Sequence, residues 1–220
     1  MFIVATYKRP ARIKDLIQTY KDTNATAPIY LIIQGDAQMY AGIEYPDTWI
    51  VEQLETNIGL VAAINYAFNK FPQKKWYGSL CDDQVPQENE WDKKLIDAVN
   101  DWNIVTSQDT INKDNSRMSG ITLLGGELIR TCQFIVPPCT WHICGDDWWE
   151  LVARTCQNWV KTDVKSTHFT PETTGIEKDE TYKSSYNDFD GQVAQYKHWL
   201  EVHGNQLLDK IKAHFKEYAK

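Results

Sequence analysis

The sequence lacks the features that place a chain in a membrane or in a secretory pathway. No apolar run reaches the roughly 18 residues that a membrane-spanning helix needs. The start, MFIVATYKRP, puts a short apolar stretch before the charges, which reverses the order found in a signal peptide. We therefore expect a protein with no membrane partner and a cytoplasmic location.

The sequence also has few cysteines and no excess of basic residues over acidic ones. The five cysteines are odd in number and show no disulfide framework, which fits a reducing compartment. A net charge of −7 at pH 7 argues against a uniformly basic nucleic-acid-binding surface, although a local basic patch is still compatible with it. Tryptophan, by contrast, is abundant: nine residues that can fill a core or stack on sugars and bases.

Apolar runs and amphipathic patterns alternate along the first half of the chain. The expected strands are short apolar runs at 2–5, 29–33, 49–51, 76–81 and 104–106. The expected helices have apolar residues at helical spacing and lie around 13–20, 60–71 and 90–102. This alternation predicts an α/β fold with a mainly parallel sheet and helices on both faces.

The second half is less regular. Its expected elements are a polar loop at 107–119, a β excursion at 121–136, a helix at 146–159, a strand within 160–168, a mobile polar loop at 170–190, and a terminal helical region at 191–218 interrupted near Gly204.

Three polar segments follow expected strands: residues 6–9, Asp36, and the pair Asp82-Asp83. In parallel sheets ligands bind at the carboxyl ends of strands, so these segments should converge on one edge. Adjacent carboxylates repel each other unless a cation or a hydrogen-bond donor neutralises them. Mg²⁺ and Mn²⁺ prefer carboxylate and phosphate oxygens, so the Asp82-Asp83 pair is a candidate metal site. The alternative for the pair is an Asx turn or a helix cap.

Taken in order, these motifs resemble a GT-A nucleotide-sugar glycosyltransferase, similar to glycosyltransferase family 2 and to compact bacteriophage-encoded enzymes. The resemblance covers residues 1 to about 190. It is carried by Thr6-Tyr7-Lys8-Arg9, Asp36, the segment from Asn57-Ile58-Gly59 to Asn65, the degenerate DXD-like motif Cys81-Asp82-Asp83, Gly145-Asp146-Asp147, and a late strand ending at His168.

The resemblance implies a GT-A (Rossmann-like) fold and a divalent metal, Mn²⁺ or Mg²⁺, bound by Asp83 and His168. It implies donor-binding roles for Ala5, Thr6, Tyr7, Arg9, Asp36, Asn57, Gly59, Asn65 and Asp82. A nucleoside diphosphate sugar, with a UDP-sugar favoured, would be the donor. His168 taken alone could equally be an ordinary hydrogen-bonded residue.

The acceptor half carries two further groups of candidates. By the same resemblance, Asp146 or Asp147 is the catalytic base; the alternative is a helix cap that suits the helix dipole. Trp141, His142 and Trp148 are expected on the acceptor side. Cys139 and Cys144 flank His142, but no second ligand pair at standard spacing supports a zinc site.

The acceptor itself has two candidates. For a phage-like enzyme in the host cytoplasm it is a hydroxymethylated pyrimidine in DNA, and otherwise it is a glycan or protein hydroxyl. Residues 179–182 could close over the diphosphate or form a solvated run of charge, and the second interpretation is the preferred one.

The expected division is a GT-A domain over 1–190, with a nucleotide-sugar-binding half at 1–106 and an acceptor half at 107–190, followed by a helical appendage at 191–220. Two other functions compete with glycosyl transfer. A sugar nucleotidyltransferase is disfavoured because residues 6–10 contain no glycine for a phosphate loop. A non-catalytic nucleotide- or glycan-binding protein is the other, since the acidic metal motif is incomplete.

Overall fold

The computed structural model describes residues 1–112, 117–175, 177–185 and 187–218. The strands are β1 (Phe2–Tyr7), β2 (Ile29–Gln34), β3 (Ile50–Leu54), β4 (Trp76–Ser79), β5 (Gln84–Pro86), β6 (Ile104–Asp109), β7 (Thr122–Gly125) and β8 (Trp159–His168). The helices are α1 (Pro10–Asp22), α2 (Leu60–Lys70), α3 (Trp91–Ala98), α4 (Gly126–Cys132), α5 (Gly145–Cys156), α6 (Pro171–Thr174), α7 (Glu180–Ser185), α8 (Phe189–Trp199) and α9 (Asn205–Tyr218), with a 3₁₀ turn at Ala37–Tyr40 and a π-helical turn at Leu200–Gly204.

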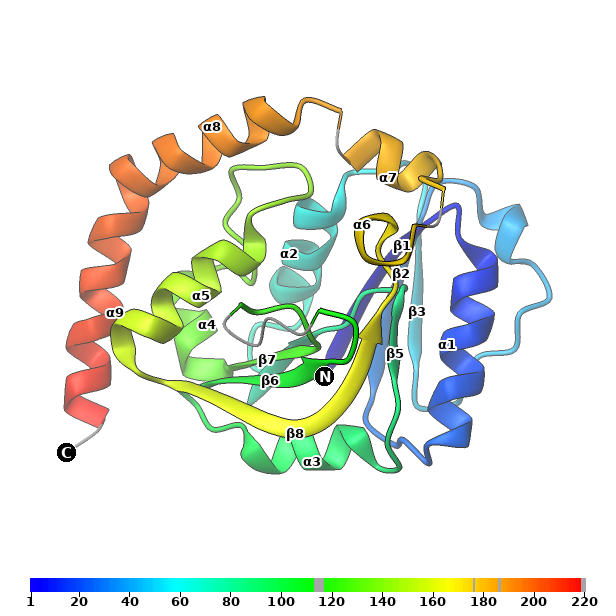
Figure 1. Ribbon diagram of the computed structural model, residues 1–220, viewed down its shortest axis with the longest axis horizontal. Coiled ribbons are helices and arrows are strands. Elements are labelled where there is room, and N and C mark those ends of the chain that lie inside the picture. Colours follow the sequence, from blue (N-terminus) through cyan, green and yellow to red (C-terminus); the bar gives the residue numbers. More distant parts are fainter. Residues whose placement is uncertain (113–116, 176, 186, 219–220) are drawn as a thin grey trace.

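These strands form one eight-stranded sheet in the order β3-β2-β1-β4-β7-β6-β8-β5 (Figure 1). The first four neighbours run parallel, as do β6 and β8. Strand β7 is antiparallel to both β4 and β6, and β5 is antiparallel to β8. The predicted α/β fold with parallel pairing in its first half is confirmed.

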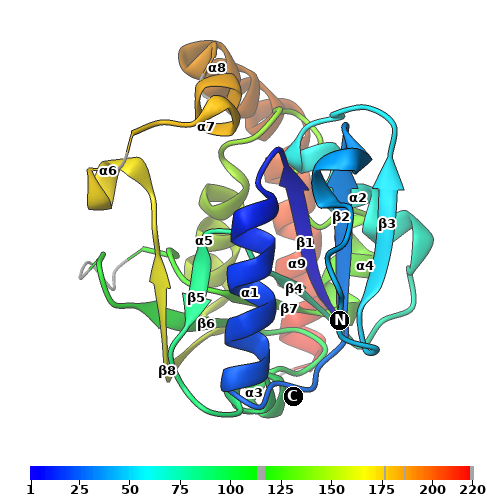
Figure 2. The same cartoon turned by 90° about the vertical axis from the view of Figure 1, so that its right-hand side faces the viewer.

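Helices cover both faces of the sheet, as the alternation predicted. Phe2 and Val4 of β1 point toward a core that includes α1 and α3, while Ile3 points toward a second core that includes α2, α4, α5 and α9. Figure 2 shows this layering, with α1 in front of β1 and α9 behind it. Because side chains alternate along a strand, a run that is apolar at every position can be buried on both faces.

The expected β excursion over 121–136 is wrong in its second part. Strand β7 ends at Gly125, and helix α4 begins at the next residue. Both glycines are packed tightly: a Cβ would lie 2.3 Å from the Asp101 backbone at Gly125 and 2.4 Å from the Lys74 carbonyl oxygen at Gly126. In the sequence pattern, two successive glycines suggest a break within an element. In the structure, the chain changes from strand to helix at these two glycines.

Three other elements were not predicted. The polar loop expected over 170–190 contains α6 and α7. Strand β5 has only three residues and ends in Pro86, so it carries too little pattern to be recognised.

The C-terminal helices form an arc along one side of the molecule (Figure 1). The expected interruption near Gly204 is confirmed as the π-helical turn between α8 and α9. Helix α9 packs against α4 and α5, and Leu208 and Ile211 join the same core as Ile3 of β1. No helix in the described part of the chain is both long and apolar enough to cross a membrane.

Asn65 connects α2 to residues 135–136, in the segment between α4 and α5. Its Nδ2 donates to the Val136 carbonyl oxygen at 2.7 Å. Its Oδ1 accepts from the backbone nitrogens of Ile135 and Val136 at 2.8 and 3.0 Å. One amide therefore satisfies three backbone groups of a segment 70 residues away.

We expect Asn65→Ala to lower the free energy of unfolding by about 1–3 kcal/mol, because half-buried backbone groups lose their partners. The matched control is Asn69→Ala, one helical turn further along α2, where the side chain is exposed. Urea unfolding of both variants checks this, and equal stabilities would contradict the structural role of Asn65.

Candidate functional site

A cleft of about 600 Å³ lies at the carboxyl ends of β1, β2 and β4. The turn at 57–59, the loop before α5 and helix α7 complete its walls. The candidate residues that line it are Ala5, Tyr7, Arg9, Asn57, Gly59, Asp82, Asp83, Trp141, His142, Asp146, Asp147 and His168. Residues from both halves of the chain therefore meet in one cleft.

Four other candidates lie elsewhere. Thr6 is buried behind the cleft, and Asn65 holds the 135–136 segment. Asp36 is exposed, and its Oδ1 accepts from the Gln38 backbone nitrogen at 3.0 Å to cap the 3₁₀ turn. Trp148 is fully buried in the core.

Two neighbours of these candidates reach the cleft without having been predicted. Gln34, at the end of β2, lines it two residues before Asp36, and its Oε1 accepts from the Ile58 backbone nitrogen at 2.9 Å. Trp149 lines it in place of Trp148, because successive residues of a helix point about 100° apart.

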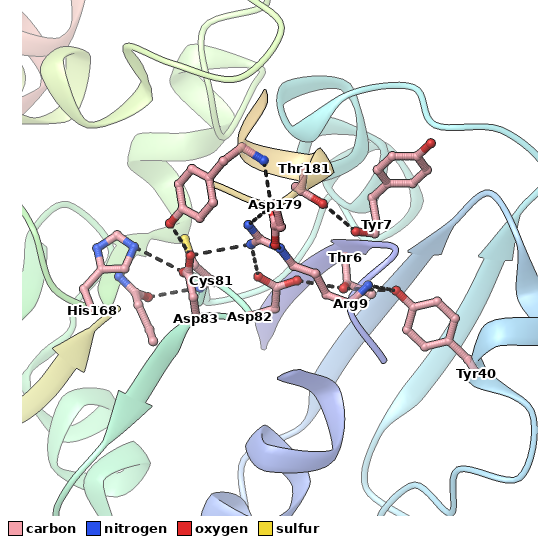
Figure 3. A network of polar contacts seen from close by, with 12 residues as sticks. Thr6, Tyr7, Arg9, Tyr40, Cys81, Asp82, Asp83, His168, Asp179 and Thr181 are labelled. Carbon is pink, nitrogen blue, oxygen red and sulfur yellow. Dashed lines mark hydrogen bonds and ion pairs between the residues drawn. The ribbon is translucent and has the colours of Figure 1, made fainter. Parts of the chain in front are cut away.

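Asp82 and Arg9 form the buried centre of the network in Figure 3. Asp82 accepts from the Thr6 hydroxyl at 2.7 Å and from Arg9 Nη1 at 2.8 Å. Lys8 adopts a left-handed φ of +55°, which turns the chain between β1 and α1. Burial raises the pKa of Asp82, while the Arg9 charge opposes that shift.

Asp83 points to a different set of partners (Figure 3). Its Oδ1 lies 3.2 Å from His168 Nε2, and its Oδ2 accepts from the Tyr182 hydroxyl at 2.5 Å. The antiparallel pairing of β5 with β8 places Gln84 opposite His168, so the sheet register itself brings the imidazole beside Asp83. The short strand that the sequence did not reveal thus assembles the predicted metal pair.

Asp83 and His168 shift each other's pKa in opposite directions. Burial acts to raise the pKa of Asp83, but His168, Tyr182 and Arg9 outweigh it and lower the pKa to about 2. Burial acts to lower the pKa of His168, but the Asp83 carboxylate outweighs it and raises the pKa. Asp83 is therefore ionised near neutral pH.

The geometry of this pair fits a divalent metal. Two neighbouring ligands of an octahedral ion, each about 2.1 Å from it, are about 3.0 Å apart, close to the 3.2 Å between Asp83 Oδ1 and His168 Nε2. A metal would replace the proton shared by these atoms. Cys81 also lies near, but burial and the Asp83 charge raise the pKa of its thiol, which makes it a poor partner for an oxygen-preferring ion.

Asp146 and Asp147 have separate environments at the start of α5. Asp147 lines the cleft and pairs with Arg117 at 2.7 Å. Asp146 lines the cleft with an exposed side chain, and the surrounding walls, followed by the Asp147 charge, raise its pKa. The N-cap residue of α5 is Cys144, whose side chain makes no capping hydrogen bond, and both aspartates lie in the first turn, where their charge suits the helix dipole. Arg117 carries no sequence signal that predicts its role.

Trp141 and Phe189 are exposed aromatic residues that line the cleft, and we refer to them as the aromatic wall. Trp141 keeps 43% of its surface exposed and packs on Gly59, where a Cβ would lie 2.7 Å from the indole. The backbone nitrogens of Trp141 and His142 both donate to Gln192 Oε1 of α8, at 3.1 and 2.9 Å. Burial lowers the pKa of His142 to about 4, so its imidazole is neutral at pH 7.

The Cys139–Cys144 segment forms no metal cluster among the described residues, where the group Cys81, Asp83 and His168 is the one found. All five cysteines are free.

No protein-family model matches the chain, and no curated protein matches it. Solved structures do. Staphylococcus aureus TarS superposes with a TM-score of 0.59 at 13% identity, over 78% of this chain and 37% of TarS. Glucosyl-3-phosphoglycerate synthase from Mycobacterium tuberculosis, solved with Mn²⁺, UDP and glucosyl-3-phosphoglycerate, gives 0.55 at 10% identity over 81% and 80%.

The catalytic domain of Drosophila β1,4-galactosyltransferase 7, in complex with xylobiose, gives a TM-score of 0.51 at 11% identity over 84% and 78%. A TarS structure of residues 1–349 with UDP-GlcNAc gives 0.58 at 13% identity over 97% and 70%. The chain spans little more than a third of the full TarS chain. At these identities the likeness concerns the fold, and the predicted GT-A fold is confirmed.

The Asp83–His168 pair predicts how the stability of the metal-free protein depends on pH. The lowered pKa of Asp83 adds stability that is present above its ordinary value of 3.8 and lost as the pH falls toward about 2. The raised pKa of His168 adds stability that is full below the ordinary value of 6.5 and lost as the pH rises through the raised value. We therefore expect the melting temperature of the wild type to exceed that of His168→Asn most between these two ordinary values, and less at alkaline pH.

Thermal unfolding in EDTA across this pH range measures the difference. His203→Asn is the control, since that imidazole is exposed in the π-helical turn. If the difference in melting temperature between the wild type and His168→Asn stays constant from acid to alkaline pH, the ion pair between Asp83 and His168 does not contribute to stability.

Proposed function

We propose that this protein is a metal-dependent glycosyltransferase that moves a sugar from a nucleoside diphosphate sugar to an acceptor hydroxyl. One observation carries the proposal: the carboxylate–imidazole pair Asp83–His168 and the cleft carboxylate Asp146 line the same cleft at the strand ends of a GT-A fold. The UDP and metal ions in the glucosyl-3-phosphoglycerate synthase structures support a UDP-sugar donor and Mn²⁺ or Mg²⁺. UDP-GlcNAc on TarS supports the same donor class.

In this proposal Asp83 and His168 hold the metal, which when bound supplies Lewis-acid neutralisation of the leaving diphosphate. Arg9 offers a guanidinium, whose planar fork matches phosphate oxygens, beside the same pair. Tyr7 and Asn57 border the cleft where the nucleoside would lie, and Gln34 there takes the place expected for Asp36.

Asp146 is the proposed base. Its carboxylate faces the cleft, and a raised pKa makes it a better proton acceptor than an ordinary aspartate. Asp147 is engaged by Arg117 and takes no proton in this scheme. A direct displacement at the anomeric carbon follows, in which Asp146 removes the proton of the acceptor hydroxyl.

The acceptor is proposed to lie against the aromatic wall. Trp141 and Phe189 are exposed and line the cleft, and flat aromatic faces stack on sugar rings and on bases alike. A glycan or protein hydroxyl and a hydroxymethylated pyrimidine in DNA are both compatible with such a wall. We propose residues 1–106 as the donor half and 107–190 as the acceptor half, with 191–220 bracing the Trp141 loop through Gln192.

The first test removes the metal ligand. We expect Asp83→Asn to lower transfer from a UDP-sugar by at least about 100-fold, since even the groups that support a metal ligand contribute about 10- to 100-fold. EDTA should abolish wild-type transfer, and Mn²⁺ should restore it.

Asp163→Asn is the matched control for this test. It removes the same charge from an exposed position of β8 outside the cleft lining. Full activity of Asp83→Asn, or full activity in EDTA, would refute the proposal. UDP binding with Mn²⁺ but no transfer to any acceptor would identify a nucleotide-binding protein on the same fold.

The second test separates the two aspartates of α5. We expect Asp146→Asn to lower kcat by about 10²- to 10⁴-fold, the usual contribution of a general base. Asp147→Asn makes the same change one residue away and should keep most of the activity, because that side chain is bound to Arg117.

The pH profile supplies an independent check. In the wild type kcat/KM should fall as the pH drops through a pKa above the ordinary 3.8 of an aspartate, because desolvation by the cleft walls, followed by the Asp147 charge, raises the pKa of Asp146. Greater loss in Asp147→Asn than in Asp146→Asn would reverse the assignment.

A further inference from the structure

Four consecutive residues, 179–182, fasten α7 to the floor of the cleft, and we refer to them as the latch. Glu180 pairs with Lys8 at 2.7 Å, and the Thr181 hydroxyl donates to the Tyr7 carbonyl oxygen at 2.7 Å. The Tyr182 hydroxyl reaches Asp83. Figure 3 shows Asp179 and Thr181 over the end of β1, although some 170 residues separate them in sequence.

Asp179 makes the most specific of these contacts. Its two carboxylate oxygens accept from Nε and Nη2 of Arg9 at 2.8 and 3.0 Å. The third nitrogen, Nη1, donates to Asp82. All three guanidinium nitrogens therefore have carboxylate partners, and the outward-facing edge of the fork is occupied by Asp179.

That edge is the one a phosphate would use. Carboxylate and phosphate both bind arginine through two parallel N–H···O bonds, so they compete for the same donors. The Arg9 side chain is only 9% exposed, whereas Asp179 is 48% exposed and can leave toward solvent. Asp82 and Asp83 already give this region two buried negative charges, so a phosphate and Asp179 beside the same guanidinium would repel each other.

We propose that Asp179 is a built-in competitor for the diphosphate, and that phosphate binding at Arg9 releases the latch. The proposal deepens the proposed function, since it assumes that the cleft takes a diphosphate, but it makes no assumption about sugar transfer. The closed latch is the ligand-free state, in which Asp179 neutralises Arg9 and Tyr182 covers Asp83. A diphosphate exchanges one anion for another on Arg9, so the guanidinium never stands unpaired.

The competition has a measurable consequence. A site whose open form is only partly populated binds with an apparent affinity reduced by that fraction. Removing the competing charge in Asp179→Asn should therefore tighten the binding of inorganic pyrophosphate with Mg²⁺ by about threefold to tenfold, the effect of an ion pair of modest strength. Calorimetry on the full chain measures both dissociation constants.

Glu180→Gln is the matched control, because it removes the same charge from the next latch residue. Its partner Lys8 is 40% exposed and lies outside the cleft lining, so pyrophosphate affinity should change less than about twofold, as expected for an exposed ion pair. Equal tightening in both variants would show a general charge effect and overturn the proposal.

Hydrogen exchange gives a second readout. The Tyr182 backbone nitrogen donates to Asp179 Oδ1 at 2.9 Å, so its amide should exchange faster in the wild type when pyrophosphate is bound. Unchanged or weaker pyrophosphate binding by Asp179→Asn, or no binding by either protein, would overturn the competition. If Asp179→Asn binds pyrophosphate more tightly but the protein transfers no sugar, the competition by Asp179 is supported and only the proposed transferase function is refuted.

Discussion

The burial of two adjacent carboxylates is the constraint on which the site depends. Asp82 and Asp83 are 7% and 4% exposed, and isolated ionised carboxylates at such burial are strongly unfavourable. The structure gives each carboxylate its own principal donors: Asp82 binds Thr6 of β1 and Arg9, and Asp83 binds groups from β8 and α7. Segments from the beginning, middle and end of the chain are therefore held at one sheet edge by the same two charges.

Asp82 and Asp83 also differ in the chemistry that their partners allow. Arg9 contacts Asp82 at 2.8 Å but Asp83 at 3.5 Å, so Asp82 is the principal anchor of the guanidinium. Asp83 keeps an oxygen directed at His168, in a geometry that suits a metal. Cys81, the residue before the pair, adds no third carboxylate to this edge of the sheet, and burial and the Asp83 charge raise the pKa of its thiol.

The opposite wall depends on the C-terminal helices. Gln192 of α8 accepts from two backbone nitrogens of the Trp141 loop, and α9 packs on α4 and α5. Helix α9 thus shares the core that contains α4 and α5, and α8 supports a wall of the cleft. The superposition on TarS covers 97% of this chain, so it includes these C-terminal helices.

The sequence by itself determined the alternation of strands and helices, the sheet edge where polar segments meet, and the candidacy of the Asp82-Asp83 pair, because burial period and strand-end carboxylates are local properties. It could not separate Asp146 from Asp147, nor Trp148 from Trp149, since each choice depends on which way a helix faces. The pairing of Arg9 with Asp179 spans 170 residues, and the Asp83–His168 contact depends on the register of a three-residue strand. Only the tertiary structure decided these, because a contact between distant residues leaves no periodicity in the chain that makes it.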